Sequence, residues 1–154
     1  MLQQAEGHFF IQSAILGIDK NEMKNIDLSK IQKVHFVGIG GIGVSAIARM
    51  MLLEGKIVSG SDTASSAIID ELRKLGAKIF LGHNAKNVAD DVDFIIHTPA
   101  IDFGNSELKK GKKLKIPILS YPEMLGLISK DKYTIAVSGT HGKTTTTAMI
   151  GKIL

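Results

Sequence analysis

The sequence predicts an α/β fold: a Rossmann-like, mostly parallel sheet with helices on both faces. Three observations lead to this expectation. Short apolar runs typical of buried strands alternate with longer segments of helical periodicity, beginning at Lys33. Two of the strand-to-helix junctions are rich in glycine. The segments between successive strands are long enough for right-handed crossovers, which join parallel neighbours.

The first strand and helix have the clearest signals. Residues 33–39, KVHFVGI, are rich in β-branched and aromatic side chains and are closed by glycine. The next helix is expected over 43–55, because Val44 and Ile47 begin an apolar series at helical spacing and Gly55 ends it.

The remaining elements follow the same alternation. Strands are expected over 56–62, 77–83, 92–100, 116–120 and 132–139, and helices over 66–76, around 105–111, over 121–130 and from 142 to the end of the chain. Gly76 ends the second helix, and Pro99 ends the fourth strand because proline has no N–H for the ladder. In a parallel sheet the carboxyl ends of all strands share one edge, where ligands bind. The glycine loop, Asp62, His83 and Thr98 are therefore expected at that edge.

The chain is long enough for one domain with a sizeable core. Residues 1–32 lack a clear signal and are interpreted as a weakly helical leader. Residues 33–130 form the expected Rossmann-like domain, and residues 131–154 begin a second unit. The segment 129–132, SKDK, is the expected boundary between the two.

Composition excludes several classes of function. The 154 residues carry 19 Lys and Arg against 15 Asp and Glu, a net charge of +4, and no cysteine, which excludes disulfides and thiolate metal sites. The lysine-rich segment 109–115 has no interleaved aromatic residues, so we expect no nucleic-acid partner. No apolar run reaches the ~20 residues of a membrane span. We expect no membrane partner and a cytoplasmic protein.

The first glycine loop has the spacing of a diphosphate-binding motif. Gly38, Gly40 and Gly43 satisfy G-x-G-x-x-G, and Gly41 adds a fourth glycine. Glycine permits a tight turn and a close approach of bare backbone to phosphate, while the helix N-terminus supplies free N–H groups. Asp62 lies 19 residues after Gly43, near the spacing of a ribose-binding carboxylate. NAD and a UDP-sugar both carry a pyrophosphate and a ribose, so the loop alone leaves both open.

The second loop, AVSGTHGKTTTT, has the G-K-[ST] core of a triphosphate-binding loop between a predicted strand and helix. Lys143 is expected to reach the β- and γ-phosphates, and the Thr144 hydroxyl to ligate Mg²⁺. Both are candidate catalytic residues. The full motif is not met, because Val137 occupies the first glycine position. The candidate ATP-binding residues are Gly139, Thr140, His141, Gly142, Lys143, Thr144 and Thr145. A nicotinamide-dependent dehydrogenase has no use for such a loop.

The stretches HFVGIGGIGVSAIA, VSGSD and GTHGKTTTT, in this order, resemble the Mur ligases of peptidoglycan synthesis from about Lys33 to Leu154. The resemblance implies three domains, for the UDP-sugar, for ATP and for the amino acid, of which residues 131–154 open the second. It implies an ATP-dependent ligase that joins L-alanine to UDP-N-acetylmuramate through an acyl phosphate, with ATP and Mg²⁺ as cofactors. The residues that it places around the UDP-sugar are Gly38, Gly40, Gly41, Ile42, Gly43, Asp62, His83 and Thr98. Two alternatives remain: the NAD(P)-binding domain of an oxidoreductase and a non-catalytic UDP-sugar sensor.

The five histidines have no helical spacing typical of a zinc site. His8 and His35 are interpreted as solvated or packed rings. His83, at a strand end, is expected on the uridine side of the site. For His97 a ligand contact and a packing role stay open.

Overall fold

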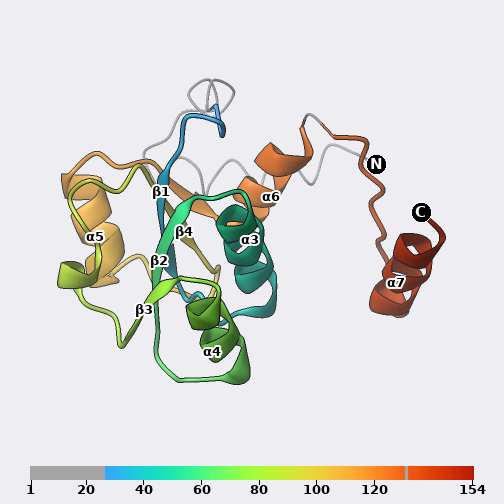
Figure 1. Ribbon diagram of the computed structural model, residues 1–154, viewed down its shortest axis with the longest axis horizontal. Helices are drawn as coiled ribbons and strands as arrows, with labels where there is room; N and C mark the ends of the chain where they lie inside the picture. The colour runs from blue at the N-terminus through green and yellow to red at the C-terminus, as the bar shows by residue number, and fades with distance from the viewer. Residues whose placement is uncertain (1–26, 131) are drawn as a thin grey trace.

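The computed structural model describes residues 27–130 and 132–154, and its centre is a five-stranded parallel sheet (Figure 1). The strands are β1 (Lys33–Val37), β2 (Ile57–Asp62), β3 (Lys78–Leu81), β4 (Phe94–His97) and β5 (Ile118–Ser120). Their order is β3-β2-β1-β4-β5, and every pair is parallel. The order reverses on either side of β1, and such a switch point opens a crevice beyond the strand ends.

Helices cover both faces of the sheet. On one face lie α3 (Ile42–Leu53), α4 (Ala67–Lys74) and α6 (Tyr121–Ser129). On the other lie α5 (Ser106–Lys113) and the 3₁₀ turn η1 (Ala85–Asn87). This arrangement confirms the predicted fold class.

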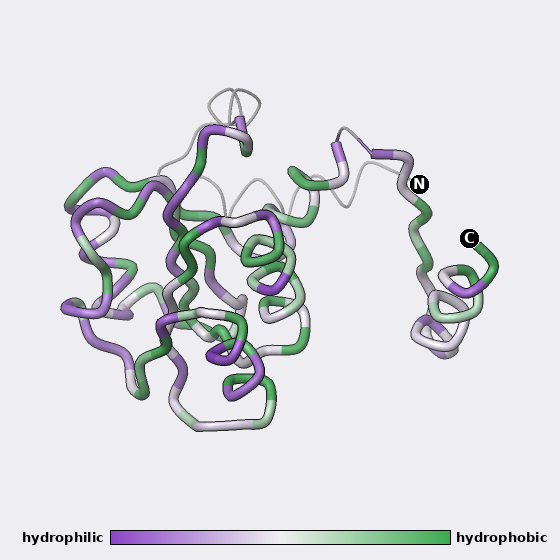
Figure 2. Tube along the Cα trace, viewed as in Figure 1, coloured by the Kyte–Doolittle hydropathy of each residue, from purple (hydrophilic) through white to green (hydrophobic). Residues whose placement is uncertain are grey.

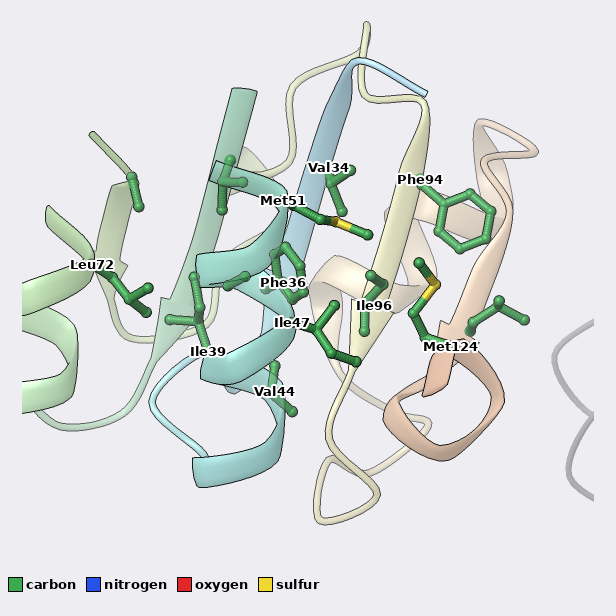
Figure 3. Packing of buried hydrophobic residues seen from close by; sticks show 14 of the residues in the cluster. Val34, Phe36, Ile39, Val44, Ile47, Met51, Leu72, Phe94, Ile96 and Met124 are labelled. Atoms are coloured by element: carbon green, nitrogen blue, oxygen red, sulfur yellow. The ribbon is translucent and has the colours of Figure 1, made fainter. Parts of the chain in front are cut away.

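Two apolar clusters hold the layers together, because alternate residues of each strand point to opposite faces. Phe36 of β1 and Ile96 of β4 pack against Ile47 and Met51 of α3, as Figure 3 shows. On the opposite face Val37, Ile95 and Ile118 pack against Leu108 of α5. Strands β1, β4 and β5 are therefore buried on both sides, which accounts for their mostly apolar sequences.

The outer surface of α5 is strongly polar. Its sequence, SELKKGKK, includes four lysines, and the tube in Figure 2 is hydrophilic over most of this helix. Two of its side chains face inward and are fully buried: Leu108, as expected of an apolar side chain, and Glu107.

The last part of the chain differs from expectation in one respect. Helix α7 (Lys143–Ile153) is present as predicted, and Figure 1 shows it apart from the sheet. The strand predicted over 132–139 is wrong, because the described residues there have no regular structure and are mostly exposed. A strand needs a neighbour for its backbone groups. The described sheet ends at β3 and β5, and neither pairs with this segment.

The expected leader lies mostly outside the described residues, as does His8. Its last part joins the domain: Ile31 is buried in the core, and Lys56 donates from Nζ to the carbonyl oxygens of Leu28 (2.9 Å) and Ile31 (2.7 Å). None of the helices within the described ranges is long and apolar enough to cross a bilayer.

Candidate functional site

A cavity of about 500 Å³ opens at the carboxyl edge of the sheet, beyond the ends of β1 to β4. It is lined by Gly38, Gly40, Gly41, Asp62, Thr63, Ala64, Ser66, His83, Thr98, Ala100 and Ile101. Six of the eight residues that the sequence proposed for the UDP-sugar thus lie around one cavity. The other two, Ile42 and Gly43, do not line it.

The glycine loop begins with a turn that requires glycine. Gly38 has a φ of +80°, and a Cβ atom there would lie 2.4 Å from Cγ2 of Thr98. The amides of Gly38 and Ile39 both donate to the carbonyl oxygen of Ser61, at 2.8 and 3.1 Å. The loop is therefore tied to the end of β2.

Asp62 holds the middle of the same loop. Its Oδ2 accepts the amide of Gly40 at 2.8 Å, and its Oδ1 accepts the amide of Thr63 at 2.7 Å. A Cβ atom on Gly40 would lie 2.9 Å from Oδ2, so the missing side chain makes room for this carboxylate. In this structure Asp62 orders the loop, and the amide of Gly40 is already engaged.

The first turn of α3 offers amides that the loop itself does not use. Gly41 is the N-cap and provides no side-chain cap. Within the described part of the chain, the amides of Ile42, Gly43 and Val44 donate no hydrogen bond. Free amides and the positive end of the helix dipole favour an anion at this point. Ile42, a residue that is 85% exposed, can therefore contribute through its backbone.

Gly43 has a packing role as well. A Cβ atom there would lie 2.5 Å from Cζ of Tyr121, the first residue of α6. The last glycine of the motif thus lets α6 approach the start of α3.

A buried carboxylate behind the cavity was missed by the sequence analysis. Glu107 is fully buried, and its Oε2 accepts hydrogen bonds from Oγ of Ser61 (2.6 Å) and Nε2 of His35 (3.3 Å). Its Oε1 accepts the amide of Asn84 (3.0 Å) and Nδ2 of Asn87 (2.6 Å). The ring of His83 completes this cluster, with Nδ1 2.8 Å from Oγ of Ser61. The only signal in the sequence was an acid beside the inward-facing Leu108 in an otherwise basic helix.

The hydrogen bonds decide the charge of Glu107. Burial raises its pKa, but the donors His35, Ser61, Asn84 and Asn87 outweigh burial and bring the pKa below the ordinary value of 4.5. The carboxylate is therefore ionised at neutral pH.

This depressed pKa predicts a specific acid sensitivity. The stabilisation by the Glu107 carboxylate is fully present above pH 4.5, the ordinary value, and is lost as the pH falls through the lower folded-state pKa. Glu107→Gln should flatten the acid side of a plot of unfolding free energy against pH, measured by urea unfolding. Glu71→Gln, which removes a carboxylate that is 55% exposed, is the matched control. Its unfolding free energy should fall with decreasing pH as steeply as that of the unsubstituted chain. An unchanged slope in Glu107→Gln would contradict this assignment.

The two remaining histidines of the sheet are packed. His35 is buried within the Glu107 cluster, as the sequence suggested. His97 is 1% exposed, its Nδ1 lies 2.9 Å from the carbonyl oxygen of Thr98, and its ring meets Phe103 edge-on. Burial lowers the pKa of His97 and keeps the ring neutral. Since His97 does not line the cavity, packing is the role that this structure supports.

The second loop lies between the irregular segment and α7. Gly139 and Gly142 have φ values of +151° and +77°, and Nζ of Lys143 folds back onto the carbonyl oxygens of Gly139 (2.5 Å) and Thr140 (3.3 Å). In the described residues the first-turn amides of α7, from Lys143 to Thr145, donate no hydrogen bond. The candidate residues Gly139 to Thr145 are all exposed and share no cavity with the first loop.

The fold and the site together define a doubly wound α/β domain with a glycine-rich turn at its switch point. Residues 33–133 match the model of the "Mur ligase family, catalytic domain". The chain belongs to the Mur ligase family.

Individual relatives agree with this placement. UDP-N-acetylmuramate–L-alanine ligases from Clostridium kluyveri and Clostridium tetani are 49% and 51% identical to the chain, over 84% and 82% of its length. A crystal structure of UDP-N-acetylmuramate–alanine ligase from Thermotoga maritima aligns with a TM-score of 0.72 at 41% identity, covering 79% of this chain and 28% of that one. A murein peptide ligase from Psychrobacter arcticus has a TM-score of 0.71 at 27% identity, covering 79% of this chain and 26% of that one.

The chain spans about 28% of the length of the curated relatives that it matches. These relatives give no support to the alternative of an NAD(P)-dependent oxidoreductase.

Proposed function

We propose that the chain is the UDP-sugar-binding part, with the opening of the ATP-binding part, of an ATP-dependent ligase that joins L-alanine to UDP-N-acetylmuramate. The observation that carries the proposal is the cavity at the glycine loop, in a chain 49% identical to a protein named for that reaction. Residues 33–130 would form the sugar-nucleotide domain and residues 131–154 the start of the ATPase domain. The proposed setting is peptidoglycan precursor synthesis in the cytoplasm.

The UDP-sugar is proposed to bind with its diphosphate at the start of α3. The unbonded amides of Ile42 and Gly43 and the bare backbone of Gly40 and Gly41 would receive the phosphate oxygens. Asp62, His83 and Thr98, which line the same cavity, would contact the uridine side.

ATP is proposed to bind at the second loop. Its phosphates would meet the free amides from Lys143 to Thr145, and the Lys143 ammonium would exchange its bonds to loop carbonyls for bonds to phosphate. The Thr144 hydroxyl bonds no described residue and is a hard oxygen ligand, so it would be a suitable ligand for Mg²⁺. Bound Mg²⁺ would neutralise charge on the phosphates.

The proposed reaction forms an amide in two steps. The γ-phosphoryl group of ATP moves to the lactyl carboxylate, giving ADP and an acyl phosphate. The amine nitrogen of L-alanine then attacks the acyl carbon, phosphate leaves, and the nitrogen loses a proton. Lys143 would stabilise the charge on the transferring phosphoryl group.

Calorimetry on the 154-residue chain tests the proposal. Titration with UDP-N-acetylmuramate should give saturable binding, and titration with NADH should give none. Binding of NADH without binding of the UDP-sugar would overturn the proposed function and restore the oxidoreductase alternative.

Lys143→Ala should separate the two loops. Because Lys143 bonds only residues of its own loop, the affinity of the chain for UDP-N-acetylmuramate should change less than about twofold. In a complete ligase carrying this segment, the same change should lower the rate of ATP-dependent phosphate release by about a hundredfold or more. A large loss of UDP-sugar affinity in the chain would show that the two sites are not independent.

A further inference from the structure

The cluster behind the cavity does more than fill space, because it controls the proton of a residue that lines the cavity. We propose that Ser61, held by Glu107, keeps the proton of His83 on Nδ1, so that Nε2 faces the ligand as a hydrogen-bond acceptor. Ser61 and Glu107 are positioning residues in this proposal, and His83 is the residue that touches the nucleotide. The inference rests on the proposed function and adds which chemical groups the site selects.

The argument begins at Glu107, the end of the chain of hydrogen bonds. An ionised carboxylate has no proton to give and can only accept. The amide of Asn84 and Nδ2 of Asn87 occupy Oε1, and the latter also donates to the carbonyl oxygen of Gly82 at 3.0 Å. Both partners of Nδ2 are acceptors, which assigns the orientation of the Asn87 amide. The oxygen left for Ser61 and His35 is Oε2.

Ser61 passes this constraint on to His83. A serine hydroxyl has one proton, and the 2.6 Å bond to Glu107 uses it. The 2.8 Å contact between Oγ of Ser61 and Nδ1 of His83 therefore needs a proton on Nδ1. In the neutral ring the lone pair is then on Nε2. No described residue bonds Nε2, and the side chain of His83 is 18% exposed where it lines the cavity.

The same residues connect His83 to the glycine loop. The carbonyl oxygen of Ser61 accepts the amides of Gly38 and Ile39, while its hydroxyl holds His83. The amide of Gly82 donates to the carbonyl oxygen of Asp62 at 2.7 Å. The acceptor on His83 is thus held at a set position relative to the anion-binding turn.

An acceptor at this position selects ligands that offer a neutral donor. A uracil imide N–H and a ribose hydroxyl are such donors, whereas the corresponding ring nitrogen of cytosine is an acceptor. Sites built to pair one donor discriminate against analogues that lack it, because a polar group is then left unpaired. A bond to the imide would contribute to the choice of a uridine nucleotide, whereas a bond to a hydroxyl would contribute to the choice of a ribonucleotide.

The tautomer of His83 can be measured directly. We expect long-range ¹H–¹⁵N spectra of the chain at about pH 8, above the usual titration range of imidazole, to show Nδ1 protonated. His83→Gln assigns the signals. Ser61→Ala should abolish the preference for the Nδ1-protonated tautomer. It should also weaken the binding of UDP-N-acetylmuramate about tenfold, the effect of one lost hydrogen bond.

Ser59→Ala is the matched control. Ser59 lies two residues earlier on β2 and bonds Nδ1 of His35 at 2.9 Å, not His83. This variant should keep the His83 tautomer and the affinity within about twofold of the parent. A proton on Nε2 of His83 in the unsubstituted chain, or an unchanged tautomer in Ser61→Ala, would overturn the proposal. The first of these outcomes does not depend on Ser61→Ala and is decisive even if that variant does not fold.

Ligand analogues identify the donor. Three analogues each lack one donor of UDP: 3-methyl-UDP lacks the imide N–H, 2′-deoxy-UDP the 2′-hydroxyl and 3′-deoxy-UDP the 3′-hydroxyl. A loss of affinity of about tenfold that is confined to one analogue assigns the bond to the donor that this analogue lacks. Equal affinities for all four would overturn the inference. If the unsubstituted chain binds no UDP-N-acetylmuramate, the proposed function fails. If it binds the UDP-sugar but His83 carries its proton on Nε2, only the present inference fails.

Discussion

Replacing Gly40 by valine is expected to weaken the binding of UDP-N-acetylmuramate by about a hundredfold or more. A Cβ atom at this position would lie 2.9 Å from Oδ2 of Asp62 and 3.3 Å from Cδ1 of Ile69, and valine adds two further carbons. Asp62 would have to move, which breaks its bond to the Gly40 amide and releases the loop. The added carbons would also occupy backbone surface proposed for phosphate. Calorimetry gives the affinity.

Gly126→Val is the matched control for this substitution. It adds the same side chain to α6 at a point where a Cβ atom would meet nothing within 4 Å, and the affinity should stay within about twofold. Urea unfolding should show that Gly40→Val stays folded with a loss of about 1–3 kcal/mol, as expected of local overpacking. If the Gly40→Val chain is folded and its affinity for UDP-N-acetylmuramate is unchanged, the glycine loop is not part of the UDP-sugar site.

Glu107→Ala is expected to lower the free energy of unfolding by about 3–5 kcal/mol, the range for removing one partner of a buried charged network. The substitution removes the acceptor of His35, Ser61 and Asn87, and the first two of these residues are fully buried. It also opens a cavity beneath α5. The loss can be measured by urea unfolding at neutral pH, with the denaturant slope used to check two-state behaviour.

An exposed carboxylate provides the comparison. Glu71 accepts a 2.7 Å bond from Nη2 of Arg49, yet its side chain is 55% exposed, and Glu71→Ala should change stability by no more than about 1 kcal/mol. If Glu107→Ala were as mild as Glu71→Ala, the buried cluster would contribute little to stability.

Periodicity and glycine content were sufficient to predict ten of the eleven expected elements of regular structure. The exception, the strand over 132–139, shows the limit of such patterns. Its apolar residues satisfy the local requirement for a strand, but a strand forms only where a neighbour pairs with its backbone, and the described chain supplies none there.

The candidate site was predictable in part from the order of the expected elements. Gly38, Asp62, His83 and Thr98 meet at one cavity because parallel strands bring their carboxyl ends together, a rule that needs only the order of elements. The bond from the Gly40 amide to Asp62 and the contact of Gly43 with Tyr121 depend on distances that no spacing rule supplies.

The sequence by itself determined the α/β class, the order of the strands along the chain and the position of both glycine loops, because these depend on side-chain periodicity and on the backbone freedom of glycine. Only the tertiary structure decided that a glutamate in a lysine-rich helix lies under the cavity, 46 residues from the serine that it holds. The physical reason is that a buried charge exists only where several distant donors converge on it, and such convergence is a property of packing, not of local sequence.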